Sequence, residues 1–238
     1  MTNPLAKKLS SFVDLSPDDL AHLDDICTDT RIWTAGRNLI REGDRPEVVF
    51  LLLEGWACRY KLLPDGSRQI MAYLIPGDLC DIHIFILKAM DHSIGLLSDG
   101  RVAIISKAVM QRTLEERPAI ARALFWSTLV DEAILREWLV NMGQRDAFAR
   151  LAHLFCEMWL RMRQMGLTDG NSFTLPLTQE ELGDTMGLTS VHVNRVLQRM
   201  RAEGLLSLAR GQMTLHNVDR LCKIADFDPN YLHLDRRD

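Results

Sequence analysis

The chain has 238 residues, of which 47% are hydrophobic and 25% charged, and its 28 Lys+Arg and 32 Asp+Glu give a formal net charge of -4. This composition is typical of a globular protein, and the length suffices for one large domain or two smaller ones. The acidic total excludes a protein that coats nucleic acid through bulk positive charge, but it leaves room for one small basic patch.

Nothing in the sequence indicates export or membrane insertion. The apolar runs Val48–Leu53 and Ile82–Leu87 are much shorter than a membrane span requires, and Met1–Ser10 lacks the apolar region of a signal peptide. We therefore expect a cytoplasmic protein with no membrane partner. Five cysteines lie at scattered spacings that fit neither a disulfide framework nor a metal site, so we expect reduced thiols: Cys27, Cys58, Cys80, Cys156 and Cys222.

Glycines recur at a nearly constant interval in the first half of the chain. Spacings of 12, 11 and 11 residues separate Gly43, Gly55, Gly66 and Gly77. Strands at such spacings, with turn residues between them, are typical of a sandwich or barrel. We therefore predict an antiparallel β-roll over residues 30–106. The β-rich stretches are Val48–Leu53, Trp56–Leu63, Gln69–Ile75 and Ile82–Leu87.

A helical pattern replaces the strand pattern after Ser106, and Pro118 suits the first turn of a long helix over 118–143. Alternating spacings of three and four form a coiled-coil seam, which predicts a dimerisation helix, although a helix buried inside a monomer is the alternative. Asp131 in this seam requires a partner. Gly143 then marks a predicted hinge. The predicted interface consists of Leu124, Thr128, Asp131, Leu135, Trp138 and Met142.

The segment that begins at Thr178 has the pattern of a helix-turn-helix. Gly183 offers a small residue where two helices cross, and Gly187 supplies the positive φ that the turn requires. Thr178 and a glutamate three residues later form a capping box, while Thr189 caps the second helix. The apolar residues left for the inner face are Leu182, Met186, Leu188, Val193, Val196, Leu197 and Met200.

The outer face of the second helix is polar and basic. Residues 189–210 hold four arginines and one acid, a local charge of +3, and such side chains read base edges and phosphates in the major groove. A face that serves only solubility is the alternative. A hairpin with a basic tip follows as a wing. The predicted DNA contacts are Thr189, Ser190, Val191, His192, Asn194, Arg195, Gln198, Arg199 and Arg210.

Together these features resemble the cyclic-AMP receptor protein / fumarate-nitrate reduction regulator (Crp/Fnr) superfamily of bacterial transcription factors, over nearly the whole chain. The resemblance rests on the glycine series with Gly77-Asp78, the long helix, and the helix-turn-helix with Arg195. It implies that Arg195 reads a guanine. Val191 or Ser190 replaces the family's frequent glutamate, and Val191 can make only apolar contacts, for instance with a thymine methyl group.

The resemblance implies an α+β fold: an N-terminal antiparallel β-roll of the cyclic-nucleotide-binding type (a double-stranded β-helix), a long dimerisation helix and a C-terminal winged helix-turn-helix. The corresponding ranges are 1–117, 118–143 and 144–238. It also implies a homodimer on a near-palindromic operator in double-stranded DNA, with RNA polymerase as a further partner if the protein is an activator.

The sensor half departs from the family members that bind cyclic AMP. Their Gly-Glu pair and their Arg-Ser or Arg-Thr pair correspond here to Asp81-Ile82 and His92-Ser93, and Leu135-Arg136 replaces a Thr-Ser pair. A buried phosphate would lack its fixed cation unless Arg136 substitutes, so we do not expect cyclic AMP. The candidate effector pocket consists of Asp81, His83, His92, Ser93, Leu135 and Arg136.

Other cofactors find little support. An iron-sulfur cluster needs a run of N-terminal cysteines, and only Cys27 precedes Cys58. Cys80 and His83 lie where haem-containing members place their ligands, but at a different spacing; a packed Cys80 and a surface His83 are the alternative. The effector is therefore left open.

No catalytic triad, phosphate loop or HExxH motif occurs, which predicts a protein that is not an enzyme. The remaining alternatives to a DNA-binding regulator with an unnamed signal are a β-roll module that acts on a protein partner and a haem-based gas sensor of the same family.

Overall fold

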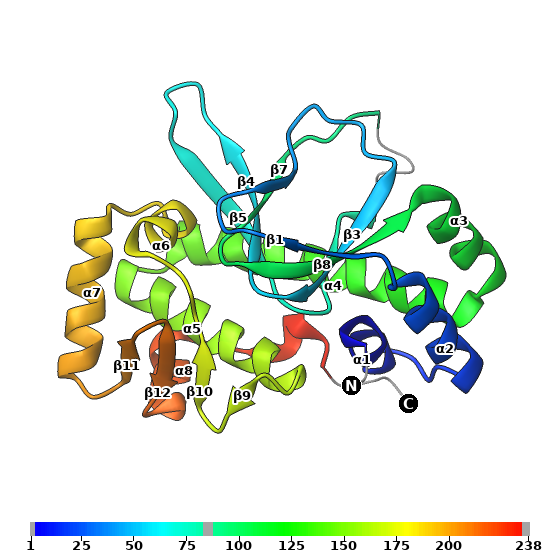
Figure 1. The fold of residues 1–238 in the computed structure, drawn as a ribbon. Helices are drawn as coiled ribbons and strands as arrows, with labels where there is room; N and C mark the ends of the chain where they lie inside the picture. The colour runs from blue at the N-terminus through cyan, green and yellow to red at the C-terminus, as the bar shows by residue number, and fades with distance from the viewer. Residues whose placement is uncertain (1–2, 83–87, 235–238) are drawn as a thin grey trace. The chain divides into compact units, whose positions relative to one another are not determined.

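The computed structural model describes residues 3–82 and 88–234 (Figure 1). The described chain divides into two compact units, one with residues up to 62 together with 71–132, the other with residues 63–70 and 133–233. None of the helices in this part of the chain has the length and apolarity that crossing a bilayer demands.

The first unit is built on a β-roll of two four-stranded sheets, ordered β1-β8-β3-β6 and β2-β7-β4-β5 (Figure 1). The strand pairs are antiparallel; for example, Phe50 in β3 lies opposite Ile104 in β8. The strands are β1 (Thr30–Trp33), β2 (Asn38–Ile40), β3 (Val48–Glu54), β4 (Ala57–Leu62), β5 (Arg68–Leu74), β6 (Leu79–Cys80), β7 (Ser93–Leu96) and β8 (Gly100–Ser106).

The β-roll predicted over residues 30–106 is confirmed, because β1 begins at Thr30 and β8 ends at Ser106. All four glycines of the regular series have a positive φ, between 86° and 98°. At Gly55 a side chain would also collide with the chain, since an added Cβ would lie 2.6 Å from the backbone oxygen of Asp99. The strand expected at Ile82–Leu87 falls almost entirely outside the described residues.

Helices α1 (Pro4–Ser10) and α2 (Pro17–Ile26) precede the roll, and α3 (Lys107–Glu116) follows it. Ser106 caps α3, because its hydroxyl accepts a hydrogen bond from the Val109 amide. The Phe12 ring stacks on Trp126 of α4, the helix that follows α3, with ring centroids 5.8 Å apart.

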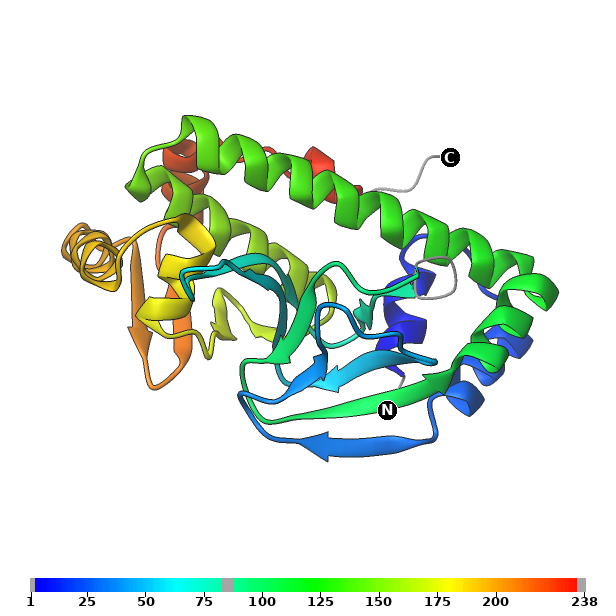
Figure 2. The same ribbon diagram turned by 90° about the horizontal axis from the view of Figure 1, so that it is seen from above.

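The long helix α4 runs from Pro118 to Gln144 (Figure 2). Its predicted start at Pro118 is confirmed. The helix continues through Gly143 and ends one residue later, so the predicted hinge at Gly143 lies in the last turn of α4 and stays a prediction. A Cβ at Gly143 would meet no atom within 4 Å, so no close contact explains a glycine there.

The residues of the predicted seam on α4 differ in how far they are exposed. Leu124 and Trp138 are only 3% and 5% exposed within their own chain, so they have almost no surface left for a partner. Asp131 finds its partner in the same protomer, because its Oδ2 accepts a hydrogen bond from Arg59 Nη1 at 3.1 Å. The large apolar side chains that α4 does expose are Phe125, Leu129, Leu135, Leu139 and Val140.

Within its described residues, the second unit contains the end of α4, four further α-helices, a short 3-10 helix and a small sheet ordered β11-β12-β10-β9. Strand β9 pairs with β10 at the edge of this sheet. The elements are α5 (Ala147–Gln164), β9 (Thr168–Asp169), β10 (Ser172–Thr174), α6 (Gln179–Met186), α7 (Ser190–Ala202), β11 (Leu206–Ala209), β12 (Gln212–Leu215), α8 (Val218–Ala225) and the 3-10 helix η2 (Pro229–Leu232).

A buried carboxylate joins three of these elements. Glu157 on α5 has no exposed surface, and its Oε2 accepts hydrogen bonds from Trp138 Nε1 and from the Tyr231 hydroxyl, both at 2.9 Å. Arg161 lies one turn further along α5, with Nη1 3.4 Å from Glu157 Oε1. Burial raises the pKa of Glu157, whereas Arg161 and the two hydrogen-bond donors favour its charged form.

Substitution of Arg59 should destabilise the first unit. Arg59→Met leaves Asp131 without its cation. We expect the free energy of unfolding, measured by urea denaturation, to fall by about 1–3 kcal/mol. Lys61→Met is the matched control, because Lys61 lies on the same strand and pairs with Glu42 at the surface. The control should change stability by at most about 0.5 kcal/mol. Equal losses in the two variants would contradict a structural role for the Arg59–Asp131 pair.

Candidate nucleic-acid interface

Two glycines set the geometry of the helix-turn-helix. A Cβ at Gly183 in α6 would lie 2.5 Å from the backbone oxygen of Leu188, so any other residue forces the turn away from α6. Gly187 ends α6 with a φ of 62°, a left-handed conformation that costs glycine little. Both predicted roles are therefore confirmed, and they bring the start of α7 against α6.

Local capping defines where the two helices begin. The Thr178 hydroxyl accepts from the Glu181 amide, and the Glu181 carboxylate accepts from the Thr178 amide, which completes the predicted capping box. Thr189 caps α7 by accepting from the amide of His192 at 3.2 Å. The inner face of α7 is buried as predicted, through Val193, Val196, Leu197 and Met200.

The opposite face of α7 is open to solvent. Val191, near the start of this helix, is 68% exposed. In Figure 1 α7 lies at the edge of the second unit. The structure places on this exposed face all the residues that the sequence predicted there: Thr189, Ser190, Val191, His192, Asn194, Arg195, Gln198 and Arg199.

The two arginines of this face differ in their surroundings. Within the described residues, the Arg195 side chain makes no ion pair or hydrogen bond, so its guanidinium is available to a ligand. Arg199 is held in place: its Nε donates to Glu203 Oε1 at 2.9 Å, and its guanidinium lies 4.3 Å from the centroid of the Phe148 ring. Arg195 is therefore the better placed of the two to read a base.

The wing presents a third cation. Strands β11 and β12 form a hairpin whose turn is Arg210-Gly211, with Arg210 exposed at a φ of 53°. Arg201 of α7 fastens this hairpin to the helix, because its Nη2 donates to the backbone oxygen of Leu208. The Arg210 side chain thus lies at the tip of the wing, as predicted.

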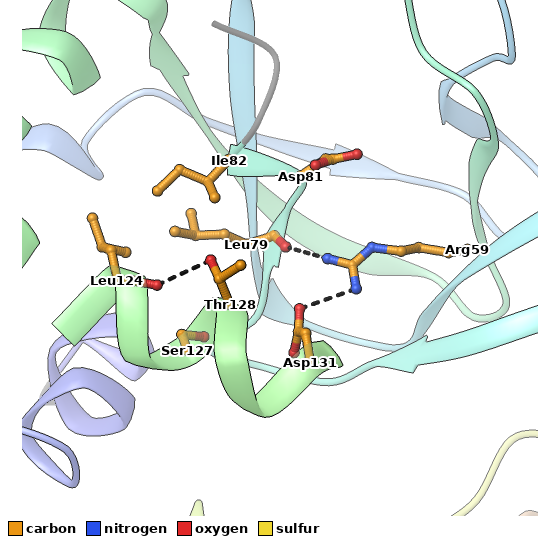
Figure 3. A pocket seen from close by; sticks show the side chains of 8 residues that line it. All are labelled: Arg59, Leu79, Asp81, Ile82, Leu124, Ser127, Thr128 and Asp131. Atoms are coloured by element: carbon orange, nitrogen blue, oxygen red, sulfur yellow. Dashed lines mark hydrogen bonds and ion pairs between the residues drawn. The ribbon is translucent and has the colours of Figure 1, made fainter. Parts of the chain in front are cut away.

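In the first unit, a cavity of about 30 Å³ lies between the roll and α4 (Figure 3). It is far smaller than a pocket for a drug-sized ligand, which occupies roughly 300–1,000 Å³. Arg59 crosses it, donating to Asp131 Oδ2 at 3.1 Å and to the Leu79 backbone oxygen at 3.2 Å. The lining residues are Arg59, Leu79, Asp81, Ile82, Leu124, Ser127, Thr128 and Asp131.

Among the described residues of the predicted effector pocket, Asp81 alone lines this cavity. The Nε2 atom of His92 lies 3.4 Å from Asp81 Oδ2. The hydroxyl of Ser93 accepts a hydrogen bond from the Glu42 amide. Leu135 and Arg136 do not line the cavity, because the residues that α4 contributes lie one to three turns earlier. His83 lies outside the described residues.

Sequence reasoning missed Arg59, the cation of this cavity. Burial alone would lower the pKa of Arg59, but Asp131 and Asp81 outweigh burial and raise it, so the guanidinium stays charged. The unpaired Asp131 of the sequence pattern was the available signal, since it demanded a cation from elsewhere in the chain. Cys80, considered as a haem ligand, is fully buried, and burial raises the pKa of its thiol to about 12.

Two family models match the chain. The model for the cyclic nucleotide-binding domain matches residues 30–117, and the model for the Crp-like helix-turn-helix domain matches residues 149–224. These ranges correspond to the β-roll with α3, and to α5 through most of α8.

Characterised relatives are similar over most of the chain. The nitrogen fixation regulation protein FixK of Bradyrhizobium diazoefficiens is 28% identical over 81% of this chain and 80% of its own length. The transcriptional activator protein FnrL of Cereibacter sphaeroides is 26% identical over 75% of this chain and 72% of its own. The solved structure of FixK2 from Bradyrhizobium japonicum shares the fold, with a TM-score of 0.72, 24% identity, and coverage of 82% of this chain and 96% of that one.

Fold and site together define a DNA-binding transcription regulator, not an enzyme, with a β-roll sensor domain and a winged helix-turn-helix. The chain belongs to the Crp/Fnr family of transcription regulators.

The approach of Gly183 to Leu188 can be tested by adding a single methyl group. Gly183→Ala forces the backbone of the turn to move, and we expect a loss of about 1–3 kcal/mol of stability in urea unfolding. Gly143→Ala is the control, because its new Cβ would meet nothing and alanine favours a helix by about 0.5–1 kcal/mol over glycine. If Gly183→Ala proved as stable as the parent, the close approach would not constrain the fold.

Proposed function

We propose that this protein is a homodimeric regulator that binds a near-palindromic operator and inserts one α7 helix per protomer into the major groove. The single observation that carries this proposal is the exposed face of α7, where an unpaired arginine, an asparagine and a valine lie together on a capped helix. Two such helices fit successive grooves when they stand about 34 Å apart.

Each exposed side chain suits a different contact. Arg195 has a free guanidinium fork that matches the O6 and N7 atoms of guanine. Asn194 suits adenine, and Val191 suits the methyl group of thymine. Arg210 at the wing tip suits a backbone phosphate. We assign Arg199 to holding the end of α7, because Glu203 and Phe148 already occupy its guanidinium.

The dimer is proposed to form through the exposed apolar face of α4. Phe125 and Leu129 lie one turn apart on α4, and Leu139 lies ten residues further along on the same half of the helix; they are 65%, 43% and 75% exposed. Such a row is costly in water and is buried when a second copy packs against it. This face replaces the seam through Leu124 and Trp138.

The signal is proposed to act at the Arg59–Asp131 pair. This pair joins β4 to α4, so an effector that enters the cavity must compete with it and thereby changes how α4 packs on the roll. A population shift between two packings of α4 would then change the fraction of DNA-competent dimer. Because Arg59 is already committed to Asp131 and to the Leu79 oxygen, cyclic AMP is not the effector that we propose.

An activating output follows by similarity. Relatives such as FnrL are named transcriptional activators, and we propose the same role here, with RNA polymerase as the partner and the cytoplasm as the location.

Arg195→Ala should lose sequence discrimination. With an operator selected from a random DNA library, we expect binding to weaken by about 1–3 kcal/mol per half-site in fluorescence anisotropy, while binding to unrelated DNA changes little. Arg112→Ala on α3 is the control, because it removes the same charge from an exposed site outside the second unit. Unchanged discrimination in the Arg195 variant would overturn its assignment.

Leu139→Glu should weaken the dimer, because it places a charge in the proposed apolar interface. Sedimentation velocity at micromolar concentration should show a shift from dimer to monomer. Ile32→Glu is the control, since Ile32 is an 83% exposed apolar residue on β1. A Leu139 variant that sediments as the parent dimer would remove this face of α4 from the interface.

A further inference from the structure

Two cysteines of the second unit lie against each other. Cys156 on α5 and Cys222 on α8 have Sγ atoms 3.7 Å apart, although 66 residues separate them in the chain. Cys156 is completely buried, whereas Cys222 is partly exposed. A disulfide bond is about 2.05 Å long, so the sulfur atoms need to approach by less than about 2 Å to bond.

The two thiols differ in a way that suits stepwise oxidation. The hydrogen bond with Cys156 lowers the pKa of Cys222 to about 7, although burial opposes this change. The same hydrogen bond and burial raise the pKa of Cys156. Cys222 therefore supplies a thiolate that solvent can reach, and Cys156 supplies a protonated thiol directly behind it. Reactive cysteines have this thiolate character and exposure.

We propose that Cys156 and Cys222 form an oxidisable modification site that takes hydroperoxides and closes to an intramolecular disulfide. In the first step the Cys222 thiolate attacks a peroxide oxygen, the O–O bond breaks, and the leaving hydroxide is protonated to water. Cys222 becomes a sulfenic acid. In the second step the Cys156 sulfur attacks the Cys222 sulfur, the S–O bond breaks, and the departing hydroxide takes the Cys156 proton. The dithiol loses two electrons and hydrogen peroxide is reduced to two waters.

The site is linked to α7 by a short chain of ion pairs. Arg220, two residues before Cys222, donates from Nη2 to Glu203 Oε2 at 2.8 Å. Glu203 also accepts from Arg199 at the end of α7. Closing the disulfide draws α8 toward α5 and moves Arg220 with it. We therefore expect oxidation to disturb the end of α7 and to weaken operator binding, a consequence that rests on the proposed function.

Mass spectrometry tests the chemistry without DNA. The reduced full-length protein is treated with hydrogen peroxide, its remaining thiols are alkylated, and it is digested with trypsin. We expect residues 151–161 to be joined to residues 221–223 by a disulfide that dithiothreitol reverses. Absence of this joined pair, or equal oxidation of all five cysteines, would overturn the site.

Variants separate the two steps. In Cys156→Ser the sulfenic acid on Cys222 cannot be resolved, so dimedone should label Cys222. Cys222→Ser should give neither label nor disulfide. Cys27→Ser is the matched control, because Cys27 is a buried thiol of the first unit and its loss should leave the disulfide intact. Labelling of Cys27 in preference to Cys222 would contradict the assignment.

Operator binding of the reduced and oxidised protein tests the linkage. We expect the disulfide form to bind about fivefold or more weakly, the lower end of typical coupling between sites, and Cys222→Ser to be insensitive to peroxide. Equal affinity of the two forms would overturn the linkage. If the reduced protein bound no selected operator while the disulfide still formed, the proposed function would fail and the modification site would stand.

Discussion

The packing of α4, α5 and η2 in the second unit depends on the buried carboxylate of Glu157. A charged group without exposed surface is stable only when its hydrogen-bond capacity is satisfied, and here Trp138, Tyr231 and Arg161 satisfy it from α4, η2 and α5. Because the Trp138 indole must reach inward to Glu157, the rotation of α4 about its axis is set at this point. Leu139, the next residue, is therefore turned outward. The proposed dimer surface follows from this hydrogen bond.

The parts of the fold that sequence reasoning predicted correctly depend on local chemistry. Thr178 and Thr189 define helix starts because capping acts within three residues, and Gly187 marks a turn because other residues avoid its φ. The regular glycine series predicted the β-roll for the same reason, since all four of its glycines have a positive φ. Gly183 is a stronger case, since only a residue without a side chain fits beside Leu188. These signals suffice to outline the helix-turn-helix and its exposed face.

Sequence reasoning could not predict the contacts between residues far apart in the chain. Helical spacing marks several apolar stripes on α4, but spacing does not say which stripe meets the protein's own core. Trp138 donates a hydrogen bond to Glu157, 19 residues away in the chain, and Asp131 accepts one from Arg59, 72 residues away. The positions of the cysteines in the sequence likewise do not indicate that Cys156 and Cys222 lie next to each other.

The exposure of Val191 has a consequence for the operators that such a protein would tolerate. A valine that packs on a thymine methyl group senses shape and excluded water, and it forms no hydrogen bond that identifies the base. 5-Methylcytosine presents a methyl group at the same place in the major groove. DNA methylation at that position would therefore turn a disfavoured cytosine into an acceptable contact, so the state of the DNA, and not only its sequence, would enter the recognition.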